Sequence, residues 1–207
     1  MVQTLSAKDI TLRQLETEFN LVFIENNQFF GEWQNNLTPI TDLEKQQLDR
    51  VKTNYINLIK FPPMLEDTVK MVVLSPLLDL AGFYASPFHI KAEQSVEISA
   101  ENNEVILKGK IDILVFKEHL WIVVIESKQP AFSIEVGLPQ ILAYMLGNPN
   151  TEKPSFGMIT TGGSFIFLKL IQGKSSQYTT SKVFELRNPG NDLYAVLSIL
   201  KGIGNRE

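Results

Sequence analysis

The sequence contains no cysteine and only two histidines among its 207 residues. The lack of cysteine excludes disulfides, thiolate zinc sites and cysteine nucleophiles. Two histidines are also too few for a histidine-based metal cage. Any metal chemistry must therefore rest on carboxylates, which prefer hard cations such as Mg²⁺.

Long apolar runs and an excess of positive charge are absent as well. No apolar run approaches the roughly 20 residues that a membrane span needs. The first residues, MVQTLSAKDI, lack the basic-then-apolar order of a signal peptide. We therefore expect a cytoplasmic protein without membrane contact. The 19 Lys and Arg residues against 23 Asp and Glu give a net charge of −4, which excludes a polycation that binds nucleic acid with its whole surface.

The hydrophobic pattern predicts two parts. Residues 1–63 predict a mainly helical extension, in which Thr41 and Glu44 form a capping box for a helix ending near Lys60. Residues 64–207 predict an α+β domain. Its expected helices and strands are a helix at 64–81, strands at 88–98, 104–116 and 121–128, a helix at 133–146, strands at 156–160 and 165–170, and a helix at 191–201. This order predicts a mixed β-sheet flanked by helices.

Three ionisable residues stand at the ends of two otherwise apolar strands. Asp112 lies in IDILVF, and Glu126 and Lys128 end the run WIVVIESK. A hairpin with a three-residue loop at 118–120 places Asp112 directly opposite Glu126. Side chains alternate faces along a strand, so Lys128 shares this face and lies beside Lys110.

Two carboxylates this close repel each other unless a cation lies between them. A hard divalent ion would remove that repulsion, and Lys128 could then hold a water as an ammonium or deprotonate it as a neutral amine. The simpler alternative is that Glu126 and Lys128 form an ion pair at the rim of the sheet. The joint pattern of Asp, tight hairpin, apolar strand and E-x-K favours the metal site.

These residues resemble the core of the PD-(D/E)XK nuclease superfamily. Asp112 takes the position of the motif Asp, with Ile111 where the motif name has Pro, and Glu126 and Lys128 match the E-x-K. The resemblance implies a restriction-endonuclease-like fold and Mg²⁺-dependent hydrolysis of phosphodiesters, with Mn²⁺ able to substitute.

The next helix extends the resemblance. Gln140 and Tyr144 are four residues apart and therefore share one helical face. They are similar to the Q-x-x-x-Y motif of RecB-like nucleases and of type I restriction R subunits, where it lies close to the catalytic hairpin. The alternative is a core tyrosine with a polar neighbour. The turn Thr161-Gly162-Gly163-Ser164 is similar to the closing T-N-G hairpin of the R subunits.

The segment from Glu66 to Phe83, which contains most of the predicted helix at 64–81, resembles the first helix of the type I R-subunit N-terminal domain, which carries a glutamate that completes the metal site. Glu66 falls on the Val69, Val73 and Leu77 stripe that should face the sheet. Asp67 is the rival acid, and an N-terminal dipole contact is the alternative for both. The resemblance extends to short cyanobacterial proteins of the restriction endonuclease subunit R type.

The resemblance implies a DNA endonuclease of a restriction system. The implied metal ligands are Asp112, Glu126 and Glu66, the implied catalytic lysine is Lys128, and the accessory or substrate-binding residues are Gln140, Tyr144 and Lys110. Gln140 is expected to contact the substrate strand or Lys128, and Tyr144 to fix the helix.

This sequence differs from type I R subunits in having no recognisable ATP-binding motif. The only Gly-Lys-Ser, at 173–175, lacks the upstream glycine of a P-loop. We therefore expect no ATP site and no motor, and partners in the form of DNA, other restriction-system subunits or a second copy. The alternative function is a catalytically silent nuclease-fold module that binds DNA or protein in a restriction, defence or repair assembly.

Overall fold

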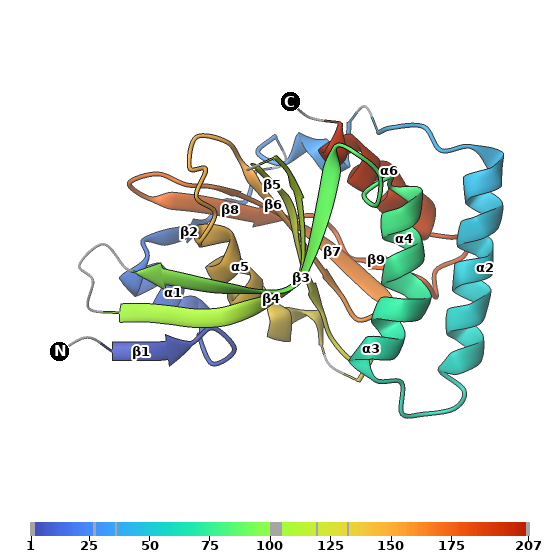
Figure 1. Ribbon diagram of the computed structural model, residues 1–207, viewed down its shortest axis with the longest axis horizontal. Helices are drawn as coiled ribbons and strands as arrows, with labels where there is room; N and C mark the ends of the chain where they lie inside the picture. The colour runs from blue at the N-terminus through green and yellow to red at the C-terminus, as the bar shows by residue number, and fades with distance from the viewer. Residues whose placement is uncertain are drawn as a thin grey trace.

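A large mixed β-sheet forms the centre of the protein (Figure 1). The computed structural model describes residues 3–26, 28–35, 37–99, 105–118, 120–131 and 133–205. The strands are β1 (Gln3–Ser6), β2 (Leu21–Phe23), β3 (Phe88–Ser99), β4 (Val105–Lys117), β5 (Leu120–Ser127), β6 (Ser155–Thr160), β7 (Ser164–Ile171), β8 (Ser176–Thr180) and β9 (Phe184–Glu185). Their order is β1-β4-β5-β6-β7-β8-β2, with β3 paired to β4 and β9 to β7.

Helices cover both faces of this sheet. They are α1 (Leu12–Glu18), η1 (Gly31–Trp33), α2 (Asp42–Leu58), α3 (Glu66–Val69), η2 (Lys70–Leu74), α4 (Ser75–Leu80), η3 (Ile134–Gly137), α5 (Leu138–Leu146) and α6 (Leu193–Gly204). Helices α2, α3–α4 and α6 bury one cluster of apolar side chains, and α1 and α5 bury the other. Val123 and Ile125 of β5 belong to the first cluster and Val124 to the second, so the clusters lie on opposite faces. The predicted mixed sheet flanked by helices is confirmed.

The N-terminal part differs from the predicted helical extension. The capping box of Thr41 and Glu44 at the start of α2 is confirmed. However, β1 pairs in parallel with β4, and β2 pairs in parallel with β8. Residues before 64 therefore contribute to the same sheet as the rest of the chain. Strands of three or four residues carry too little alternation to reveal themselves in the sequence, and their partners lie far along the chain.

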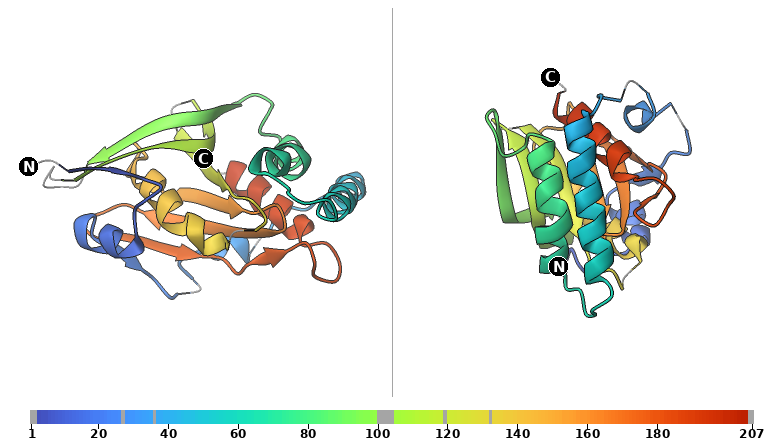
Figure 2. Two further views of the ribbon diagram at one scale, coloured as in Figure 1. Left: turned by 90° about the horizontal axis from the view of Figure 1, so that it is seen from below. Right: turned by 90° about the vertical axis from the view of Figure 1, so that its right-hand side faces the viewer.

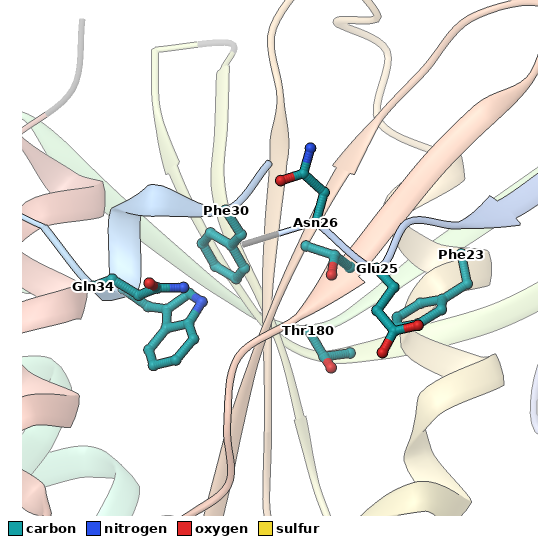
Figure 3. A pocket seen from close by; sticks show the side chains of 8 residues that line it. Phe23, Glu25, Asn26, Phe30, Gln34 and Thr180 are labelled. Carbon is teal, nitrogen blue, oxygen red and sulfur yellow. The ribbon is translucent and has the colours of Figure 1, made fainter. Parts of the chain in front are cut away.

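A small hollow lies between this N-terminal part and the sheet (Figure 3). Its volume is about 120 Å³. The lining comes from β2, from the following segment that includes η1, and from β8: Phe23, Glu25, Asn26, Phe30, Trp33, Gln34, Thr179 and Thr180. Phe30 is almost completely buried and its ring lies 6.0 Å from that of Phe156 in β6.

The predicted helix at 64–81 is confirmed as one continuous helical run, with a wider turn in its middle. Within η2 the Ser75 N–H bonds to the carbonyl of Lys70, five residues earlier. The next residue, Pro76, has no N–H to donate, so the regular ladder cannot continue there. The run ends before Gly82, whose φ of +81° suits the left-handed conformation that closes a helix. Figures 1 and 2 show this run lying beside α2.

The other predicted elements are present, with shifted ends. The closing helix runs from Leu193 to Gly204, whereas the sequence predicts it at 191–201. The short strands β8 and β9 were not predicted. No helix within the described residues is long and apolar enough to cross a membrane.

The turn between β6 and β7 leaves no room for side chains. Gly162 has a φ of +82°, and a Cβ on Gly163 would lie 2.5 Å from the Tyr55 hydroxyl of α2. Tyr55 is itself buried. The two glycines therefore let α2 pack directly on this turn.

We expect Gly163→Ala to lower the free energy of unfolding by about 1–3 kcal/mol, because the added methyl group clashes with Tyr55. Urea denaturation measures the change. Gly173→Ala is the control, since the nearest atom to its Cβ is 3.6 Å away. In a Tyr55→Phe background the loss should shrink, because the hydroxyl is gone. An equal loss in both backgrounds would show that the clash is not its cause.

Candidate active site

Strand β4 changes partner in its middle, and Asp112 stands at the change. Residues 105–108 pair with β1, whereas residues 113–117 pair with β5. On the other edge of β4, the β3 residue opposite Asp112 is Glu93, which has a φ of +51° and interrupts the pairing. The sheet therefore opens at Asp112, which leaves its carboxylate free of regular strand packing.

The hairpin register predicted for this end of the strands is confirmed. Ile113 pairs with Ile125 and Leu114 with Val124, which places Asp112 beside Glu126. The predicted three-residue loop is wrong, because β4 ends at Lys117 and β5 begins at Leu120. A bulge between residues 115 and 116 shifts the register by one residue and compensates for the shorter loop.

The Asp112 carboxylate accepts a hydrogen bond from the backbone of β5 where β4 and β5 separate. The Ser127 N–H donates to its Oδ2 at 2.8 Å. Burial raises the pKa of Asp112 above its usual range, and the negative charge of Glu66 adds to this, against the lowering effects of the Ser127 bond and the Lys70 and Lys128 ammoniums. The carboxyl group is thus fixed in place by the backbone of the neighbouring strand.

Glu126 is buried, and only one of its two carboxylate oxygens has a hydrogen-bond partner among the described residues. Its side chain is 2% exposed, and Oε1 accepts from Lys128 Nζ at 2.6 Å. Oε2 is buried and has no hydrogen-bond partner among the described residues. Burial and then the charge of Asp112 raise the pKa of Glu126 to about 7. The ion pair with Lys128 that was the alternative interpretation is present, but inside the protein and not at a solvated rim.

A chain of hydrogen bonds joins this pair to α5. Lys128 Nζ donates to Gln140 Oε1 at 3.0 Å, and Gln140 Nε2 donates to the Tyr144 hydroxyl at 2.9 Å. Tyr144 is completely buried, and burial raises its pKa to about 12. The Lys110 backbone and Gln140 work against this rise in the pKa of Tyr144. Of the two contacts expected for Gln140, the one with Lys128 is therefore present.

The side chain of Lys110 does not join this group. It is 63% exposed and lies 3.6 Å from Glu93 of β3. In the described part of the chain it forms no ion pair with Asp112 or Glu126. The expectation that it lies beside Lys128 is wrong because the β4–β5 pairing begins at Ile113, so residue 110 does not lie opposite residue 128.

The upstream helix supplies the other side of the site. Val69, Val73 and Leu77 are completely buried, as expected of the stripe facing the sheet. Glu66 is half-buried and its charge acts on both Asp112 and Glu126, whereas Asp67 is exposed. Of the two rival acids, Glu66 is therefore the one at the site.

Lys70 is a site residue that the sequence interpretation missed. Its Nζ lies 2.7 Å from Glu66 Oε1 and 3.4 Å from Asp112 Oδ1. The signal was available, because Glu66 and Lys70 are four residues apart on one helical face.

The carboxylates do not converge as they stand. In the ranges that the structure describes, no three Asp, Glu or His side chains lie close enough together to hold a metal ion. The ammonium of Lys70 lies between Glu66 and Asp112, and that of Lys128 binds Glu126. The donor chemistry nevertheless fits a hard divalent cation, because two neighbouring carboxylates include a buried oxygen that has no hydrogen-bond partner among the described residues.

Comparison with known proteins adds no assignment. Neither a protein-family model nor a curated protein matches the chain. The function must therefore be argued from the site.

The raised pKa of Glu126 predicts a pH dependence of stability in the metal-free protein. Because this pKa is higher in the folded than in the unfolded chain, the stabilisation is complete below pH 4.5 and is lost as pH rises through about 7. Between pH 5 and 8, in a chelator, the parent should lose about 2 kcal/mol more unfolding free energy than Glu126→Gln.

Urea denaturation at both pH values measures this difference. Glu97→Gln is the control, because that carboxylate is exposed and pairs with Lys108 away from the site. It should keep the pH dependence of the parent. A Glu126→Gln variant with the parental pH dependence would contradict the assigned pKa.

Proposed function

We propose that the chain is a Mg²⁺-dependent DNA endonuclease with a restriction-endonuclease-like core of the PD-(D/E)XK type, without an ATP-driven motor. One observation carries the proposal most strongly. Within the part of the chain that the structure describes, Glu126 has a buried carboxylate oxygen without a hydrogen-bond partner, beside Asp112 at the point where β4 and β5 separate. Such an arrangement is costly for a structural role alone, because it gives up a hydrogen bond inside the protein.

The same residues serve phosphodiester hydrolysis. Asp112 and Glu126 provide the oxygen ligands for a divalent cation, with Glu66 as the third acid. When bound, such an ion supplies positive charge for a phosphate oxygen and lowers the pKa of a water. Mn²⁺, which shares the preference of Mg²⁺ for oxygen ligands, substitutes for it.

The Lys128 ammonium orients the attacking water and offsets negative charge that develops on the phosphate. Gln140 holds this ammonium by the 3.0 Å hydrogen bond, and Tyr144 holds Gln140. The role of these two residues is thus to position Lys128. DNA as the substrate and a restriction system in the cytoplasm as the setting follow from the resemblance of the motifs. Partner subunits or a second copy would help to hold the duplex, since the net charge of −4 gives little general attraction to nucleic acid.

Asp112→Asn tests the activity directly. It keeps an acceptor for the Ser127 N–H but removes the charge, so cleavage should fall at least about 100-fold while the fold persists. Cleavage of supercoiled plasmid with Mg²⁺ or Mn²⁺ measures the rate, and circular dichroism checks the fold. Glu97→Gln is the charge-matched control and should cleave like the parent. Equal cleavage by Asp112→Asn and the parent at matched purity would refute the assignment.

A second candidate is a catalytically silent nuclease-fold module that binds DNA or protein. It is favoured by the two ammoniums that already neutralise the carboxylates, and by the lack of a converged metal-binding group among the described residues.

Calorimetric titration with Mn²⁺ at pH 8 separates the two candidates. The nuclease should bind the ion, and Asp112→Asn should lose this binding. A folded parent that binds no Mn²⁺ would favour the silent module.

A further inference from the structure

Lys70 bridges two acids that the proposed metal site needs. Its Nζ lies 2.7 Å from Glu66 Oε1 and 3.4 Å from Asp112 Oδ1, and its side chain is 24% exposed. The side chain is therefore a cation held by the acids of the site.

The backbone sets this position. Lys70 is the first residue of η2, and its carbonyl accepts the Ser75 N–H of the widened turn. The preceding turn carries Glu66, so that a helical i, i+4 pair points into the opening of the sheet. The adjoining Val69 and Val73 are completely buried and anchor this part of the helix. The Lys70 side chain is thus restricted to this place, whereas a surface lysine can adopt many side-chain conformations.

The ammonium and a divalent ion cannot share this place. A metal ion binds carboxylate oxygens at about 2.1–2.6 Å, so an ion joining Glu66 and Asp112 would come into direct contact with Nζ. Like charges at such a distance repel strongly in a partly buried site.

We propose that Lys70 is the resident counter-ion of the metal-free site, and that a divalent cation binds only by displacing its ammonium from Glu66 and Asp112. The proposal rests on the proposed function, because it takes these acids as the metal-binding group. Lys70 is in this view a positioning residue that holds the acids in place without metal and sets the affinity for it.

The second ammonium of the site is held differently. Lys128 bonds both Glu126 and Gln140, and Gln140 is fixed by Tyr144. The polar contacts of Lys70 Nζ within the described residues are to the two acids alone. Lys128 therefore stays when a metal ion enters, and Lys70 is the one that moves.

Lys70→Gln tests the displacement without using activity as the readout. Calorimetric titration with Mn²⁺ at pH 8 should show affinity at least about tenfold higher than in the parent, because the competing charge is gone. In a chelator the same variant should melt at a lower temperature than the parent, since the acids then repel each other. Lys70→Arg, which keeps the charge, should bind Mn²⁺ as weakly as the parent.

Lys45→Gln is the matched control. Lys45 forms a comparable helical ion pair with Asp42 at 2.9 Å, on exposed α2 residues. Its loss should leave Mn²⁺ affinity unchanged. The combination Lys70→Gln with Asp112→Asn should lose the binding, which shows that the ion enters this site.

The outcomes separate this proposal from the nuclease assignment. If the parent binds Mn²⁺ at the site and folded Lys70→Gln binds it no more tightly, the role of Lys70 is refuted and the proposed function stands. If neither the parent nor Lys70→Gln binds Mn²⁺, both are refuted. Binding by Lys70→Gln but not by the parent would support Lys70 as the residue that blocks the ion, and would favour the silent module for the parent.

Discussion

Two carboxylates brought together at an opening in a β-sheet are the constraint on which the site depends. Asp112 and Glu126 are neighbours because the β4–β5 register makes them so. Burial raises the pKa of each, and a neighbouring negative charge adds to this, from Glu66 at Asp112 and mainly from Asp112 at Glu126. Without compensation such a pair would be strongly destabilising. The backbone N–H of Ser127 and the ammoniums of Lys70 and Lys128 provide the compensation.

The two ammoniums come from opposite layers of the fold. Lys128 is held through Gln140 and Tyr144 of α5, which belongs to one buried cluster. Lys70 is held by the helix whose Val69 and Val73 belong to the other cluster. The site therefore forms only when both layers are packed on the sheet. The packing of α2 on the glycine turn strengthens one of these layers, since a Cβ on Gly162 would lie 3.0 Å from Val69 and 3.1 Å from Tyr55.

The parts of the site that depend on local spacing could be predicted from the sequence. That Asp112 lies beside Glu126 follows from a tight hairpin, and that Gln140 and Tyr144 share a face follows from the helical period. The bulge near Phe116 could not be predicted. A three-residue loop without a bulge and a two-residue loop with a bulge both place Ile113 opposite Ile125. Lys70 was visible four residues after Glu66, but its contact with Asp112 depends on tertiary packing.

The remaining differences concern pairing between distant segments. Strands β1 and β2 are short and find their partners a long way along the chain, so their alternation gives no usable signal. Lys110 was placed by continuing an ideal strand through Asp112, where the real sheet opens. Local periodicity thus predicts which residues meet within one hairpin or helix, and tertiary packing decides which helices complete the site.

A crystal structure of the protein grown with Mn²⁺ tests the central claim most directly, because the anomalous signal locates the ion without reference to activity. We expect one ion within about 2.1–2.6 Å of oxygens from both Asp112 and Glu126, with the Lys70 ammonium moved away from Asp112. A structure in which Mn²⁺ is absent from these carboxylates, while Lys70 still bridges Glu66 and Asp112, would contradict it.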